Sequence, residues 1–150
     1  MRDKNHASYL RAIFRTKDLI SRAEIGLAPI RNDFDAFVGT GISGAAVVPL
    51  LAHKFGKEFA IVRKYRDGSH SPYTIECGFQ GDVRWLFVDD FIQSGETARR
   101  ASKAMYDKFP YSTCVGGWLY HEGVTVAGTL YREGLLVEAM NVIDGLASYW

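Results

Sequence analysis

The chain has 150 residues, of which 47% are hydrophobic and 23% charged, and its formal net charge is +1 at pH 7. These values are typical of one soluble globular domain with a full hydrophobic core, and they give no general reason to expect binding to nucleic acid or to an anionic membrane, although a local nucleic-acid-binding patch stays open. No stretch reaches the roughly 18 apolar residues of a spanning helix, and the polar start Met1–His6 is unlike a signal peptide, so we expect a cytoplasmic protein.

The first half of the chain predicts two helices and two strands. A helix is expected from Ala7 to about Ala23, then a strand at Phe34–Val38, a helix over Ser43–Phe55 and a strand at Phe59–Val62. Pro49 lies inside the second helix and should kink it or mark where its regular hydrogen bonding begins.

The second half begins with a polar segment, residues 63–82, which contains a short strand near Tyr73–Glu76. The unbroken apolar run Trp85–Val88 suits a strand in the middle of a parallel sheet. A helix over Thr97–Phe109 and three further β segments complete the order: Ser112–Leu119, Val124–Leu130 and Leu135–Val142. This order predicts one α/β domain over residues 1–150, with a doubly wound parallel sheet.

Two adjacent carboxylates, Asp89 and Asp90, follow the predicted central strand. They would lie at its carboxyl end, where open α/β sheets bind their ligands. The segment Ser94–Thr97 then opens a helix, so its backbone N–H groups and two hydroxyls would form a cradle for an anion. A ligand with a phosphate at one end and a polyol in its middle would satisfy both features, and the acids could also hold magnesium through water. The simpler alternative is that the two acids only cap a turn.

A glycine pattern, Gly39-x-Gly41-x-x-Gly44, lies between a predicted strand and a predicted helix and formally matches the dinucleotide-binding fingerprint. That fingerprint requires an acid at the end of the second strand, whereas this chain has Arg63 and Lys64 there, which would at best suit NADP. A plain tight turn is a simpler interpretation of these glycines.

The stretch Val88–Thr97 (VDDFIQSGET) resembles the phosphoribosyl-pyrophosphate (PRPP) motif of the type I phosphoribosyltransferases. That motif is a hydrophobic strand, two acids, two apolar residues and a Thr-Gly-x-Thr-like loop. The resemblance implies the type I phosphoribosyltransferase fold, with a small hood formed by the terminal segments. It also implies a magnesium-dependent transfer of 5-phosphoribosyl from PRPP to a nitrogenous base, a purine being favoured, with release of pyrophosphate by a homodimer.

The same resemblance assigns binding roles residue by residue. Asp89 and Asp90 would hold the ribose hydroxyls and, through the ligand or water, magnesium. Ser94, Gly95, Glu96 and Thr97 would hold the 5′-phosphate, mostly through backbone N–H groups, and the substrate-binding segment would also include Phe91, Ile92 and Gln93. The pyrophosphate loop would be Thr40, Gly41, Ser43 and Gly44.

A basic segment supplies the implied catalytic cations, Arg63, Lys64 and Arg66, which could offset the charge of pyrophosphate. Residues 61–64 followed by 71–78 resemble the adenine phosphoribosyltransferases, which carry an Arg-Lys pair, a flexible loop and Tyr-Ser-Leu-Glu-Tyr-Gly. This places Glu76 on a loop glutamate proposed to handle a proton on the base. The orotate enzymes are the nearest rival, and His70 could fill their histidine position.

Two other functions remain open from the sequence. A regulatory module could keep the PRPP site in order to sense nucleotides, with RNA as a second ligand. An NADP-dependent reductase would use the glycine pattern and leave the acid pair without a role.

Overall fold

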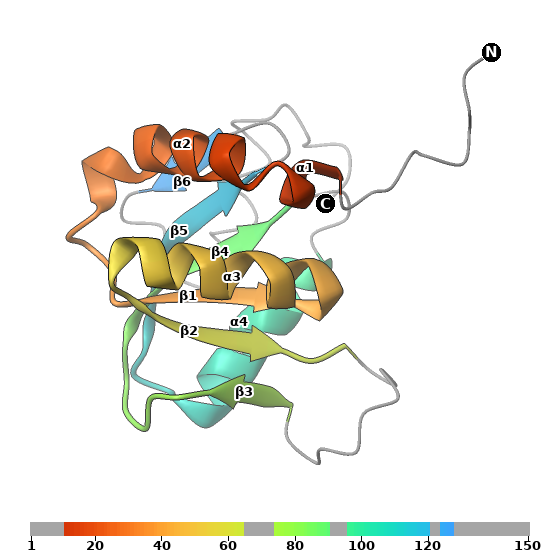
Figure 1. The fold of residues 1–150 in the computed structure, drawn as a ribbon. Coiled ribbons are helices and arrows are strands. Elements are labelled where there is room, and N and C mark those ends of the chain that lie inside the picture. The colour runs from red at the N-terminus through yellow and green to blue at the C-terminus, as the bar shows by residue number, and fades with distance from the viewer. Residues whose placement is uncertain (1–10, 65–73, 91–95, 121–123, 128–150) are drawn as a thin grey trace, which may run out of the picture.

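A computed structural model describes residues 11–64, 74–90, 96–120 and 124–127 (Figure 1). The helices are α1 (Arg11–Phe14), α2 (Thr16–Leu27), the short 3-10 helix Ala28–Ile30, α3 (Gly41–Phe55) and α4 (Glu96–Lys108). The strands are β1 (Ala36–Thr40), β2 (Glu58–Val62), β3 (Ile75–Cys77), β4 (Arg84–Asp89), β5 (Thr113–Leu119) and β6 (Val124–Ala127). Within these residues, no helix has the length and apolar character needed to cross a membrane.

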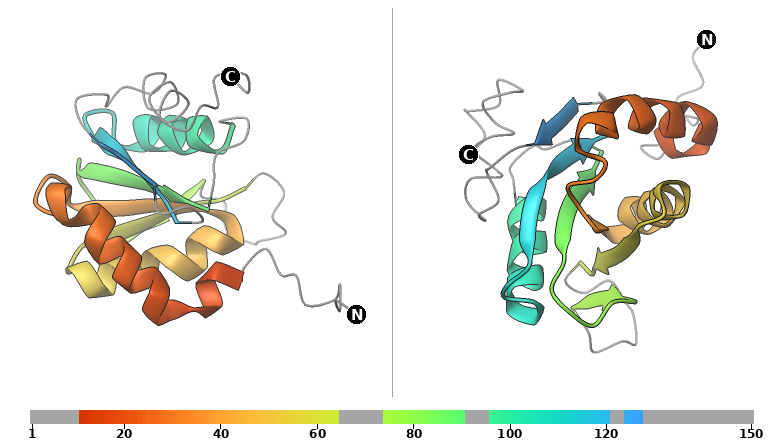
Figure 2. Two further views of the ribbon diagram at one scale, coloured as in Figure 1. Left: turned by 90° about the horizontal axis from the view of Figure 1, so that it is seen from above. Right: turned by 90° about the vertical axis from the view of Figure 1, so that its left-hand side faces the viewer.

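The strands form one sheet in the order β3-β2-β1-β4-β5-β6. The four inner strands are parallel, because β1 pairs with β2 and β4, and β4 pairs with β5. Helices α2 and α3 cover one face of this sheet and α4 covers the other (Figure 2). The predicted doubly wound α/β fold is therefore confirmed.

The two edge strands depart from the predicted parallel arrangement. Strand β3 is antiparallel to β2, and β6 is antiparallel to β5. A parallel neighbour requires a crossover connection of a dozen or more residues that returns to the start of the sheet, and the short link from β5 to β6 cannot make one. Hydrophobic patterns predict that a strand exists but not the direction in which it pairs.

Within the described residues, the predicted elements agree with the structure apart from their ends and one interruption in the first helix. The expected first helix is divided at Arg15, whose φ of −96° and ψ of 63° are not helical, and α2 continues to Leu27. Pro49 lies within the continuous helix α3. The predicted strand Leu135–Val142 lies outside the described residues.

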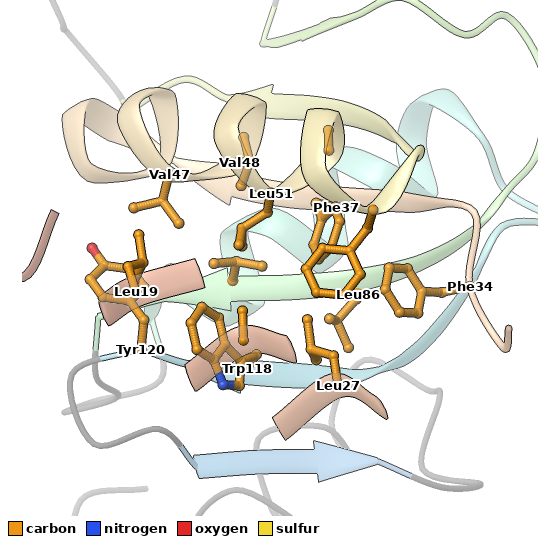
Figure 3. Close-up of a cluster of buried hydrophobic side chains, with 14 of the residues drawn as sticks. Leu19, Leu27, Phe34, Phe37, Val47, Val48, Leu51, Leu86, Trp118 and Tyr120 are labelled. Atoms are coloured by element: carbon orange, nitrogen blue, oxygen red, sulfur yellow. The ribbon is translucent and has the colours of Figure 1, made fainter. Parts of the chain in front are cut away.

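Alternation along the inner strands divides the core between the two faces of the sheet. On the α3 side, Phe37, Leu86 and Trp118 come from three neighbouring strands and are fully buried against side chains of α2 and α3 (Figure 3). On the α4 side, Val38 and Phe87 pack in a second cluster with the apolar face of α4. Each such buried large side chain contributes about 1.5–3 kcal/mol, so both faces hold the inner strands in register.

The amino ends of β1 and β4 are joined by an ion pair between Asp35 and Arg84. Arg84 Nη2 donates to Asp35 Oδ1 at 2.8 Å, while its Nε and backbone N–H donate to Oδ2 at 3.1 and 2.9 Å. The side-chain hydrogen bond from Arg84 is the main cause that lowers the pKa of Asp35 below its ordinary value of 3.8. This ion pair therefore stabilises the amino ends of β1 and β4.

We expect Asp35→Asn to destabilise the fold at neutral pH. Because the folded state lowers the pKa of Asp35, the ion pair stabilises the protein above pH 3.8 and this contribution is lost as the pH falls through the lowered pKa. Urea unfolding should give a lower midpoint for the variant at pH 7, with the difference shrinking toward pH 3. Asp33→Asn, an exposed neighbour, is the control; equal midpoint losses in both variants would contradict the assignment.

Candidate functional site

The residues predicted to bind ligand converge at the carboxyl ends of β1, β2 and β4. Thr40 is the last residue of β1 and pairs in register with Val62, the last of β2. On the other side of β1, Val38 pairs with Phe87, and these residues stand two positions before Thr40 and Asp89. The described part of the glycine pattern, the Arg63–Lys64 pair and the acid pair therefore lie at one edge of the sheet.

The turn from β1 into α3 depends on Gly41. Thr40 is extended, with φ −133° and ψ 149°, and Gly41 then takes φ +62°, a conformation that strains residues with a side chain. A Cβ built on Gly41 would lie 2.6 Å from Lys64 Cε and 3.2 Å from Lys64 Nζ. The Lys64 side chain thus lies directly against the backbone of this turn, which brings a cation to the predicted pyrophosphate loop.

The third glycine of the pattern has a packing role. A Cβ on Gly44 would lie 2.7 Å from the carbonyl carbon of Gly39, and one on Gly39 would lie 2.9 Å from Gly44 Cα and 2.8 Å from Val48 Cγ1. Strand and helix therefore touch through their backbones. This contact sets where α3 begins relative to the edge of the sheet.

The N-terminus of α3 fits an anion. The helix has 15 residues, no side chain caps its first turn, and that turn contains no acidic residue. The first backbone N–H groups of a helix have no partner within the helix, and the helix dipole favours negative charge there. With the Lys64 ammonium beside Gly41, this end of α3 can bind a phosphate or pyrophosphate group.

Asp89 is partly buried and fixed by two backbone contacts. The N–H of Asp90 donates to Asp89 Oδ1 at 2.9 Å, and the N–H of Tyr120 donates to the Asp89 carbonyl at 3.0 Å. Burial, followed by a side-chain hydrogen bond with Asp90 and the charge of Asp90, raises the pKa of Asp89 to about 8, against the opposing effects of the Asp90 backbone N–H and the positive charge of Lys64. A ligand that brings hydroxyl donors or a cation would stabilise the ionised form of this carboxylate.

Asp89 points to the α4 side of the sheet, because Phe87, two residues earlier in β4, belongs to the α4-side core. Lys64 lies two residues beyond the end of β2, and its positive charge counteracts the rise in the pKa of Asp89.

The donor set fits a magnesium ion that is shared with a ligand. Among the residues that the structure describes, no group of three or more His, Cys, Asp and Glu side chains could hold a metal by itself. Magnesium commonly takes one or two carboxylates and completes its coordination with substrate phosphates and waters. Asp89 and Asp90 would supply the two carboxylates for that arrangement.

Two predicted catalytic residues, Arg63 and Glu76, form an ion pair. Arg63 Nη1 lies 3.1 Å from Glu76 Oε1, and the Arg63 backbone N–H donates to the Thr74 carbonyl at 2.8 Å. Glu76 pairs in register with Ile61, which packs against the α3-side core, so Glu76 lies on that face, opposite to Asp89. The sequence presented these two residues as separate catalytic groups, and the structure brings them together.

Glu96 and Thr97 begin α4, one residue earlier than predicted. Glu96 accepts a hydrogen bond from Arg100 at 3.4 Å and its side chain is 76% exposed, so its charge is partly balanced by its own helix. Thr97 is partly buried, and Ala98 and Ala101 carry the buried face of the helix.

The remaining predicted site residues lie outside the described part of the chain and stay predictions. These residues are Arg66, His70, Phe91, Ile92, Gln93, Ser94 and Gly95.

One supporting residue, Arg22 of α2, was not predicted from the sequence. Arg22 Nη1 donates to the Tyr120 carbonyl at 2.8 Å, and the Tyr120 N–H donates to the Asp89 carbonyl. Helix α2 is thereby tied to the end of β4. The two partners are 98 residues apart, and no local pattern signals such a contact.

Comparison with known proteins gives matches among solved structures alone, since no family model and no curated protein matches the chain. Adenine phosphoribosyltransferase from Saccharomyces cerevisiae, complexed with adenine and an imino-altritol bisphosphate, matches with a TM-score of 0.56 and 23% identity over 70% of this chain and 69% of that chain. A second adenine phosphoribosyltransferase gives a TM-score of 0.57 and 21% identity over 74% and 76%.

Orotate phosphoribosyltransferase from Mycobacterium tuberculosis, in complex with inorganic phosphate, gives a TM-score of 0.52 and 19% identity over 74% of this chain and 57% of that chain. The chain thus spans just over half the length of the orotate enzyme. These likenesses confirm the fold that the PRPP-like motif predicted. The chain has the type I phosphoribosyltransferase fold, which it shares with adenine and orotate phosphoribosyltransferases.

Proposed function

We propose that the protein binds PRPP and transfers its 5-phosphoribosyl group to a nitrogenous base, with release of pyrophosphate. The observation that carries this proposal is the meeting of the Gly41 turn, Lys64 and Asp89 at the carboxyl edge of a sheet with this fold. An anion site and a carboxylate pair at one edge match a ligand that carries both phosphates and ribose hydroxyls.

Each part of the site has a role in this reaction. The N–H groups at the start of α3, from Gly41 to Gly44, would bind the departing pyrophosphate together with Lys64. Asp89 and Asp90 would accept hydrogen bonds from the ribose hydroxyls. The predicted loop Ser94–Thr97 would hold the 5′-phosphate at the start of α4.

Catalysis would rest on stabilising the charge that leaves with pyrophosphate. The bond from ribose to pyrophosphate breaks through an oxocarbenium-like transition state, so groups held ready around the leaving oxygens lower the barrier. Magnesium, when bound through Asp89 and Asp90, would add charge neutralisation on the phosphate oxygens. Lys64, two residues beyond the end of β2, would contribute the same effect as a fixed charge.

A purine is the proposed acceptor base, and a homodimer the proposed assembly. Two of the similar structures are adenine phosphoribosyltransferases and one is an orotate enzyme, which supports the transfer class more strongly than the choice of base. The dinucleotide alternative gains no support, because β3 is antiparallel to β2 and the residues after β2 are Arg63 and Lys64.

The decisive experiment measures pyrophosphate release from PRPP and magnesium with adenine, hypoxanthine, guanine, xanthine, orotate, uracil and nicotinamide in turn. We expect release with one base, adenine first among them, and none when magnesium is chelated. Calorimetric binding of PRPP without release for any base would favour the nucleotide-sensing module. Absence of both binding and release would reject the PRPP site itself.

A further inference from the structure

We propose that Glu76 is a positioning residue that competes with pyrophosphate for the guanidinium of Arg63. This inference rests on the proposed function and departs from the general acid/base role that the sequence suggested for Glu76. The carboxylate would set how tightly the pyrophosphate group is held, and so how readily it leaves.

The geometry of the pair supports a holding role. Arg63 directly follows β2, and its backbone N–H is fixed by the Thr74 carbonyl at 2.8 Å. Glu76 lies in β3 opposite Ile61, two residues back from Arg63 along β2. The 3.1 Å contact between Arg63 Nη1 and Glu76 Oε1 therefore draws the guanidinium back along the α3 side of the sheet, away from the edge where β1 ends at Thr40 and α3 begins at Gly41.

The exposure of the two side chains supports exchange of the partner. The Arg63 side chain is only 14% exposed, so its charge requires a close anion, whereas the Glu76 side chain is 49% exposed and lies partly in water. A guanidinium can bind phosphate oxygens through two of its nitrogens. A pyrophosphate at the start of α3 carries more charge than one carboxylate and can therefore displace it.

The position of Arg63 relative to the pyrophosphate loop makes the exchange a short movement. Thr40 and Val62 are paired across β1 and β2, so Gly41 and Arg63 leave the sheet side by side. Lys64, the next residue, already lies against Gly41. Lys64 would thus be a permanent cation of the loop and Arg63 a cation whose availability Glu76 controls.

Calorimetric titration of magnesium pyrophosphate into the full chain tests this inference. Glu76→Gln should bind pyrophosphate about threefold to tenfold more tightly than the wild type, because the competing charge is gone. Glu76→Asp keeps the charge and should bind within about twofold of the wild type. In an Arg63→Gln background the Glu76→Gln change should lose most of its effect, since the pair no longer exists.

Steady-state kinetics separate this role from the alternatives. The Glu76→Gln variant should show a lower KM for PRPP by a similar factor, which a purely structural pair would not produce. An unchanged or weaker pyrophosphate affinity would overturn the inference, as would a loss of kcat of about a hundredfold at constant affinity, the result for a general acid/base. If the wild type binds neither PRPP nor pyrophosphate, the proposed function fails and this inference fails with it.

Discussion

Asp89→Asn/Asp90→Asn should lower the affinity for PRPP by about a hundredfold or more. With PRPP and magnesium bound, each carboxylate would be ionised and would accept a charge-assisted hydrogen bond from a ribose hydroxyl, and two such bonds are together worth about 3 kcal/mol or more. The double variant also loses both predicted carboxylate ligands of magnesium. Calorimetry with PRPP in the presence of magnesium measures the loss directly.

The same double variant should remain folded, which separates binding from stability. Burial raises the pKa of Asp89 from 3.8 to about 8, so this group destabilises the folded state progressively as the pH rises above 3.8, and an amide removes that cost at pH 7. The melting temperature should be equal to or above that of the wild type. Asp107→Asn, an exposed aspartate that pairs with Lys103 on α4, is the matched control and should leave PRPP affinity unchanged.

If the double variant bound PRPP as tightly as the wild type, the role of Asp89 and Asp90 in PRPP binding would be disproved. Loss of binding together with a lowered melting temperature would instead show that Asp89 supports the fold through its contacts with Asp90 and Tyr120. The Asn side chain keeps a hydrogen-bond acceptor, so the backbone geometry at the end of β4 should be preserved.

Gly44→Ala should have the largest effect on stability of any single methyl group added to α3. The new Cβ would lie 2.7 Å from the carbonyl carbon and 3.1 Å from the Cα of Gly39, and backbone atoms in the central strand β1 cannot move aside as a flexible side chain can. The helix must lift from the sheet, which opens the packing of Val48 against β1. We expect a loss of about 2–3 kcal/mol in the free energy of unfolding.

Gly56→Ala, at the other end of the same helix, provides the matched control. Gly56 has φ +65°, but a Cβ there would meet nothing within 4 Å, so the cost is backbone strain alone, about 1 kcal/mol. Urea unfolding of both variants compares the two costs in one experiment. A smaller loss for Gly44→Ala than for Gly56→Ala would mean that the contact between β1 and α3 yields easily.

The sequence determined most of the local structure and indicated which segments are candidates for ligand binding. The apolar run before Asp89 predicted a central strand because a strand buried on both faces cannot carry polar side chains. Glycines at 39, 41 and 44, and the acid pair at 89 and 90, marked the ends of two strands because turns and binding loops need those residue types. These signals depend on neighbours within about ten residues, and such neighbours are visible in a sequence.

The tertiary structure alone decided which of these residues meet. The direction of β3, the ion pair between Arg63 and Glu76, the placement of Lys64 against Gly41 and the support of Asp89 through Tyr120 and Arg22 all join segments that are distant in the chain. Each depends on the register of strands and on the face to which a side chain points. A shift of one residue reverses that face, and no local pattern encodes the pairing that sets it.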